Sequence, residues 1–291
     1  VAIQYSVLDP DTTSGTVTPN FVTPSFQYNI GGGYQNITSG YLAAGDLSNK
    51  GVSPSTYSIH GATWNAKSQI PGTYSAAAQL RVTVNDNEAA NNTTSTVVSF
   101  VLDTKNPNPT AFNINAASGT ISFTTSDDSN LRYELSNNST GSSDGSNAIS
   151  GQWQTVGGTS TSTSMSWNFG SSTYPTVYLV SQDIYGNTVT STAVAPSQPT
   201  GMAVRDISNP TAGQYQNFIS WSVYTSVPSS TFANYKLYRS LNTDTPSNYS
   251  LLANVNDINT NYYRDASLSS STLYYYKVLV TDTDGDISNY S

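Results

Sequence analysis

The chain has 291 residues, enough for two or three domains, and contains 21 tyrosines but no cysteine. Its net charge of −8, with only ten lysines and arginines, excludes a basic surface of the kind that follows a nucleic-acid backbone. Without cysteine there are neither disulfides nor thiolate metal sites. No apolar stretch reaches the length of a membrane span.

The first predicted elements are a strand in VAIQYSVLDPD at the start of the chain and a hairpin in FQYNIGGGYQNI. Period-two alternation in the hairpin places Phe26, Tyr28 and Ile30 on one buried face, and three glycines make the turn. A short strand in YSIHGATWNA and a longer one in QLRVTVNDNEAANN follow, the second ending in an acidic turn. This order of elements is typical of a β-sandwich.

The same order of elements recurs twice, at intervals of about a hundred residues. LRYELSNN and GQWQTV repeat the hairpin, with TSMSWNFG and TVYLVSQDIYGN after it. YKLYRSLN, NYSLLANV, NTNYYRDASL and LYYYKVLVTDTDGDIS give the third copy. The chain is therefore predicted to be all-β, with three tandem sandwiches arranged as a rod: residues 1–104, 105–196 and 197–291.

The third module resembles a fibronectin type III domain. FISWSVY places Trp221 on strand B, Tyr235 opens strand C, and LSSSTLYYYKVLV carries Leu268 and Tyr274 at the spacing of that family, with a serine where the family usually has proline. The resemblance implies that these residues are structural. It further implies that Tyr274 is the tyrosine-corner residue, with a buried ring and a hydroxyl bonded to nearby backbone.

The first two modules look like the immunoglobulin-like or fibronectin-like modules of long prokaryotic surface proteins, and FVLDTKNPNPT resembles the linkers between such modules. NPTAFNINAASG supplies a strand A to the second module, whereas the first module begins at strand B and DISNYS stops where strand G would begin. Two interpretations remain open. Either the sequence is a window on a longer array, or a neighbouring copy donates the missing strand by β-augmentation.

Acidic and amide side chains concentrate in the B–C and F–G loops, which crowd one pole of a sandwich. Oxygen-only ligands with several carboxylates suit Ca²⁺, although Asp and Asn also favour turns without any metal. The predicted calcium ligands at the pole of the second module are Asp103, Asn106, Asn108, Asp127, Asp128, Asp183 and Asn187. A second predicted site, in the first module, consists of Asp9, Asp11, Asp86 and Glu88.

The segment TDTDGDIS in the third module lacks the full spacing and the terminal glutamate of a helix–loop–helix calcium site, and as an F–G turn it needs no metal. Catalytic residues are not expected either. His60 is the only histidine, and it has no cysteine partner and no Gly-x-Ser-x-Gly motif to work with. Tyr275, which points opposite to its tyrosine neighbours, is the candidate contact residue.

These observations predict an extracellular structural protein without enzymatic activity, a segment of a surface layer, stalk or filament. It requires no cofactor other than a candidate Ca²⁺. Its expected partners are further copies of itself, in a filament or lattice, or neighbouring modules of a longer chain. The alternatives are an adhesin that binds a glycan or a protein, and accessory domains of a secreted hydrolase.

Overall fold

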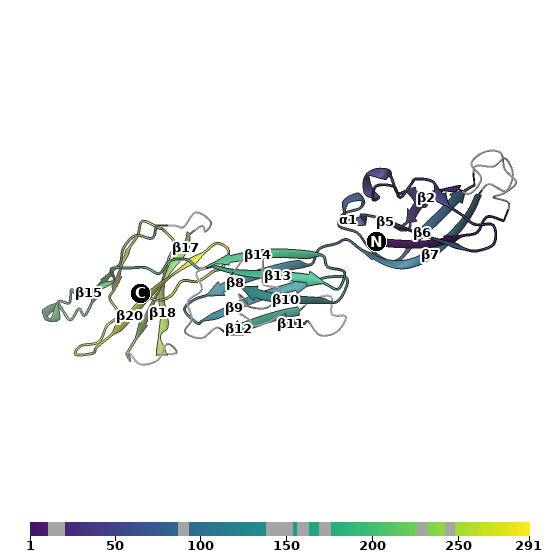
Figure 1. The fold of residues 1–291 in the computed structure, drawn as a ribbon. Helices are drawn as coiled ribbons and strands as arrows, with labels where there is room; N and C mark the ends of the chain where they lie inside the picture. Colours follow the sequence, from purple (N-terminus) through teal and green to yellow (C-terminus); the bar gives the residue numbers. More distant parts are fainter. Residues whose placement is uncertain are drawn as a thin grey trace. The chain divides into compact units, whose positions relative to one another are not determined.

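The chain folds into antiparallel strands joined by turns, and its described part contains a single four-residue α-helix (Figure 1). This confirms the all-β class. No helix among the described residues has the length and apolar character needed to cross a membrane. The computed structural model describes residues 1–10, 21–86, 93–137, 154–155, 163–168, 176–225, 232–241 and 248–291.

Two compact units make up the chain, the first ending at Asn106 and the second beginning at Pro107. The first unit contains one hydrophobic core, and the second contains two. Each of the three predicted module ranges therefore has a core of its own. The first unit ends at Asn106, two residues beyond the predicted boundary at residue 104. The second and third sandwiches together form the second compact unit.

The first sandwich packs a two-stranded sheet, in which β1 pairs with β5, against a sheet of order β3-β2-β6-β7 with β4 paired to β2. Among the described residues β1 has only this one partner, and the lack of a strand A stays a prediction. Its elements are β1 (Ala2–Val7), β2 (Phe21–Asn29), β3 (Gln35–Asn36), η1 (Ser39–Tyr41), β4 (Lys50–Gly51), β5 (Ser58–Thr63), α1 (Ala66–Gln69), β6 (Tyr74–Asn85) and β7 (Thr93–Asp103).

The aromatic hairpin of the first sandwich is β2 followed by β3. Phe26 and Tyr28 are buried as predicted, because alternate residues of β2 face the core. Ile30 is 37% exposed, so the prediction that it lies on the buried face is wrong. The chain has already turned there: Gly31 has a φ of +114° and its N–H is bound by the Asn29 side chain at 2.8 Å, a geometry that favours glycine.

The second sandwich consists of sheets β12-β9-β8 and β11-β10-β13-β14. Strand β8 is the predicted strand A, and it delivers Ile114 to a core that also holds Leu135 and Leu179. Its strands are β8 (Asn108–Asn115), β9 (Thr120–Ser126), β10 (Leu131–Ser136), β11 (Gln154–Thr155), β12 (Thr163–Asn168), β13 (Thr176–Asp183) and β14 (Thr188–Val194).

The third sandwich consists of sheets β15-β16-β19 and β18-β17-β20. Trp221 is buried but directly follows β16, because that strand ends one residue earlier than predicted, and Tyr235 lies inside β17 rather than at its start. Its elements are β15 (Ala203–Asp206), η2 (Pro210–Ala212), β16 (Asn217–Ser220), β17 (Phe232–Ser240), β18 (Ser250–Val255), β19 (Tyr262–Asp265) and β20 (Tyr275–Asp282).

The predicted tyrosine corner has the expected hydrogen bond but not the expected burial. The hydroxyl of Tyr274 accepts from the backbone N–H of Ser269 at 3.0 Å, while the ring is half-buried; Leu268 and Tyr275 are half-buried as well. The fully inward tyrosine of this run is Tyr276, whose side chain alternates onto the core face of β20.

Replacing Tyr274 with phenylalanine should lower the free energy of unfolding of the third sandwich by about 1 kcal/mol, the usual net value of one hydrogen bond. The effect stays small because Ser269 is exposed and its N–H can bind water instead. Urea denaturation would measure it, with Tyr262→Phe, at an exposed tyrosine of the same sandwich, as the control. A loss above about 3 kcal/mol would show that the ring supports more than this bond.

The end of the chain joins the second and third sandwiches. Ser288 and Ser291 donate backbone hydrogen bonds to β20, so that the last residues run beside it as the beginning of a strand G. Ile287 accepts from the backbone N–H of Ala116 at 2.9 Å and donates to the carbonyl of Ile114 at 2.8 Å. These bonds continue from one sandwich into the next.

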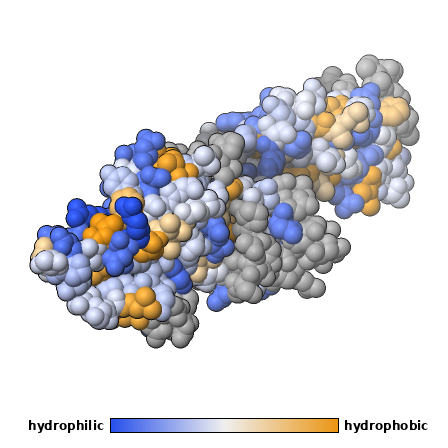
Figure 2. Space-filling model, turned by 90° about the vertical axis from the view of Figure 1, so that its left-hand side faces the viewer, coloured by the Kyte–Doolittle hydropathy of each residue, from blue (hydrophilic) through white to orange (hydrophobic). Residues whose placement is uncertain are grey.

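The surface is polar, with apolar residues in separate small patches on the face shown in Figure 2. Among the described residues, β7 carries three exposed valines, Val97, Val98 and Val101, which are between 40% and 54% exposed. Strand β7 is also the last strand in its sheet.

Candidate metal centre

Asp127 directly follows β9 and is held in place by the turn that it begins. Its Oδ2 accepts from the backbone N–H of Ser129 at 3.2 Å and from the Ser129 hydroxyl at 2.6 Å, an arrangement typical of Asx turns. The residue is only 7% exposed, and its Oδ1 has no hydrogen-bond partner among the described residues. A buried carboxylate oxygen without a donor is costly, so Oδ1 is poised to accept a further ligand.

Asp183 ends β13 in the neighbouring sheet and is held even more firmly. Its Oδ1 accepts from the backbone N–H groups of Tyr185 and Asn187, both at 2.8 Å. Its Oδ2 accepts from the side-chain amide of Asn187 at 2.6 Å. Gly186, with a φ of +86°, makes the turn that brings these donors back to the carboxylate. The carboxylate is therefore fixed in position, as a metal ligand has to be.

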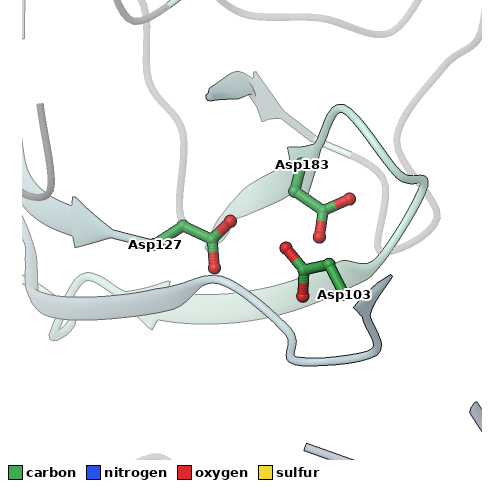
Figure 3. Close-up of side chains that lie close together, drawn as sticks. All are labelled: Asp103, Asp127 and Asp183. Carbon is green, nitrogen blue, oxygen red and sulfur yellow. The ribbon is translucent and has the colours of Figure 1, made fainter. Parts of the chain in front are cut away.

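Asp103 ends β7 and precedes Pro107 by four residues, so the chain itself limits its distance from the start of the second unit. Its Oδ1 accepts from the backbone N–H of Lys105 at 3.0 Å. Figure 3 labels the side chains of Asp127 and Asp183, which belong to the same unit. One carboxylate oxygen of Asp127 lies within 4.8 Å of one of Asp183, and both residues are buried.

Two carboxylates at this separation repel one another strongly in a poorly hydrated place. A hard cation that prefers oxygen would offset the repulsion and take up the unused Oδ1 of Asp127. The geometry thus suits Ca²⁺ better than a softer metal, since neither a histidine nor a cysteine belongs to the group.

The other predicted ligands of this site have different surroundings. Asn106 accepts from the Lys67 ammonium at 3.0 Å, and Asn187 donates its amide to Asp183, so that it orients a ligand. Asn108 and Asp128 are exposed. That these four residues bind a metal stays a prediction.

The second predicted site, in the first sandwich, is described only in part. Asp9 is buried and Asp86 is half-buried, whereas Asp11 and Glu88 lie outside the described residues. This site also stays a prediction. His60 lies on β5, where its Nε2 is 2.8 Å from the carbonyl oxygen of Gly51, a contact that a structural histidine makes.

No family model matches the chain, and the comparison with curated proteins gives no match. Three solved structures illustrate what it resembles. The FN1–FN3 domains of chicken CNTN1 are 11% identical and cover 100% of this chain and 91% of their own, with a TM-score of 0.30. Domains from titin are 13% identical and cover 92% and 88%, with a TM-score of 0.25.

A Fn3-like protein from Clostridium thermocellum is 22% identical and covers 33% of this chain and 95% of its own, with a TM-score of 0.23. The sheets described above define the fold independently of these likenesses. The chain is an array of antiparallel β-sandwich modules.

Proposed function

We propose that the chain is a structural segment of an extracellular prokaryotic protein, a stalk, filament or surface-layer element that has no enzymatic activity. The observation that carries this proposal is the hydrogen-bonded joint between the second and third sandwiches. Here Asn115 and Ile287 pair as a parallel β-bridge, and the backbone bonds of Ile287 to Ile114 and Ala116 cross from one sandwich to the other.

Such a joint restricts rotation between modules. Interfaces between domains of one chain are usually polar and permit relative motion. Here the carboxylate of Asp286 also accepts from the backbone N–H of Ile114 at 2.7 Å and of Val194 at 3.3 Å. Hydrogen bonds to a charged acceptor contribute about 1.5–3 kcal/mol each. A protein whose role is to hold modules in a fixed order benefits from this restriction, whereas a flexible tether does not.

The exposed valines of β7 support assembly into larger structures. A long strand at the end of a sheet presents unpaired backbone groups, and proteins that avoid association normally protect such strands with charged residues. Val97, Val98 and Val101 are apolar, and between them lie only Ser99 and Phe100. This edge fits lateral contact with another copy.

Electron microscopy of the protein isolated from its source tests the proposal. We expect ordered rows or a lattice of copies on the cell surface. A charged variant of the β7 edge, Val98→Lys, should weaken the assembly without unfolding the sandwich, because Val98 is 54% exposed. Copies that remain dispersed, and that bind glycans or a host protein, would instead identify an adhesin and contradict the structural role.

We further propose that Asp127 and Asp183 bind Ca²⁺. At a Ca²⁺ concentration about 100 times the Kd, the site should add about 2.7 kcal/mol to the free energy of unfolding. Asp127→Asn removes the negative charge of the carboxylate, whose Oδ1 has no hydrogen-bond donor among the described residues. The amide oxygen of the asparagine can still accept from Ser129. Calorimetric titration of this variant should lose one Ca²⁺-binding event.

The matched control for this experiment is Asp206→Asn, which removes an exposed aspartate of the third sandwich that also accepts from a serine two residues on. It should bind Ca²⁺ as the unchanged protein does. Equal Ca²⁺ binding by the Asp127 variant and the unchanged protein would refute the site.

A further inference from the structure

The acidic turn after β20 has the same framework as the turn that holds Asp183. Asp282 ends β20, and its Oδ1 accepts from the backbone N–H groups of Asp284 at 3.1 Å and Asp286 at 2.8 Å. Gly285, with a φ of +93°, occupies the position of Gly186. Each of the two sandwiches therefore has a turn of the same type, and the two turns have related sequences, Asp-Ile-Tyr-Gly-Asn and Asp-Thr-Asp-Gly-Asp.

The two turns differ at their fifth residue. In the second sandwich the amide of Asn187 donates to Oδ2 of Asp183. In the third sandwich Asp286 stands at that position, and an ionised carboxylate has no proton to donate. Oδ2 of Asp282 consequently has no hydrogen-bond partner among the described residues, although Asp282 is only 3% exposed. A neutral donor has been exchanged for a second negative charge.

A pocket of about 420 Å³ opens beside this pair, at the joint between the second and third sandwiches. It is lined by oxygen-bearing side chains from both of them, and no basic side chain is among its lining residues: Asn113, Thr192, Asp282, Asp284 and Asp286 carry the oxygens. Asn113 is fixed there because its amide donates to the carbonyl of Asp284. Such a lining suits a cation that prefers hard oxygen ligands.

We propose that this pocket binds a divalent cation of the Ca²⁺ class, with Oδ2 of Asp282 as a ligand. The cation would occupy Oδ2 of Asp282, as the neutral amide of Asn187 occupies Oδ2 of Asp183 in the second sandwich by donating a hydrogen bond. Because Asp286 binds the backbone of Ile114 and Val194, the cation would also neutralise the charge repulsion next to the joint. This inference does not depend on the structural role proposed above.

A proton is the competitor of the cation. Burial, together with the charge of Asp282, raises the pKa of Asp286 to about 6, and burial also raises the pKa of Asp282. A carboxyl group with a raised pKa binds more protons in the folded than in the unfolded state.

The test is Ca²⁺ titration by calorimetry and thermal melting at pH 7, in an Asp127→Asn background that removes the other proposed site. We expect this protein to bind Ca²⁺ and to melt at a higher temperature than in EDTA. Adding Asp282→Asn should weaken Ca²⁺ binding by at least roughly tenfold and remove the Ca²⁺-dependent rise in melting temperature.

The Asp282→Asn variant should still fold. Its side-chain oxygen can accept from the same two N–H groups, and its amide can donate to Asp286, which reverses the arrangement seen with Asn187. Melting in EDTA checks this, and Asp206→Asn is again the control for charge alone. Absence of Ca²⁺ binding in the Asp127→Asn background, or Ca²⁺ binding that Asp282→Asn does not weaken, would overturn the proposal.

Discussion

Replacing Trp64 with alanine is expected to lower the free energy of unfolding of the first sandwich by about 3–5 kcal/mol, the usual range for removing a large aromatic side chain from a core. The side chain has no exposed surface and stacks on Tyr28, with ring centroids 5.1 Å apart. Its Nε1 also donates to the Gln69 side chain at 2.7 Å. The substitution thus leaves a cavity and an unused hydrogen-bond acceptor.

Differential scanning calorimetry measures this effect on one module, because the first unit has a core of its own. For a domain of this size, the loss corresponds to a decrease in melting temperature of more than about 10 °C. Tyr57→Ala is the matched control, since that aromatic ring belongs to the same sandwich and is 69% exposed. A uniform shift of every transition would contradict the independence of the first unit.

Replacing Asp265 with alanine is expected to destabilise the third sandwich by about 3 kcal/mol, because it leaves buried partners without their acceptor. The carboxylate accepts from Arg239 at 3.0 Å and from the buried hydroxyl of Tyr276 at 2.9 Å. It also accepts from the backbone N–H and the hydroxyl of Ser267. Arg239 is 26% exposed and can turn toward water, which keeps the loss at the lower end of the range for such pairs.

Asp257→Ala is the control for this substitution. Asp257 caps a similar turn, accepting from Asn259 at 2.9 Å and from Thr260 at 3.0 Å, but it is exposed and no arginine binds it in the described structure. Chemical denaturation should show a clearly smaller loss for this variant than for Asp265→Ala, because water replaces the lost acceptor at an exposed turn. Equal losses for the two variants would mean that the arginine and the tyrosine contribute nothing.

The pH dependence of Asp265 follows from the same contacts. Burial alone would raise its pKa, but the hydrogen bonds from Ser267, Arg239 and Tyr276 outweigh burial and hold the pKa below its ordinary value of 3.8. The stabilisation is therefore complete above pH 3.8 and is lost as the pH falls through the lower pKa of the folded state. Acid titration of the Asp265→Ala variant should lack this loss.

Alternation along the chain was enough to predict the strands and much of the core. Phe26 and Tyr28 follow from it, because a strand with one buried face repeats every two residues. It failed at the ends of strands. Ile30 continues the pattern but lies next to a glycine turn, and Tyr274 precedes β20 by one residue, so neither is buried as predicted.

The grouping of Asp127 with Asp183 could be predicted because the topology of a sandwich puts the B–C and F–G loops at one pole. The role of Asp286 could not be predicted, because it depends on which backbone groups of a different sandwich lie opposite the turn. For the same reason, the sequence could not predict that Oδ2 of Asp282 has no hydrogen-bond partner among the described residues. Only a comparison of two folded turns shows that Asp286 replaces the donor that Asn187 provides.

The bonds of Ile287 to the second sandwich have a mechanical consequence. Tension along the chain reaches the few hydrogen bonds between Ile287 and residues Ile114 and Ala116 before it can pull apart either core. Because the joint has so few contacts, opening it costs less free energy than unfolding a packed sandwich. A stretched molecule would therefore lengthen first by releasing this joint, reversibly, while all three hydrophobic cores stay folded.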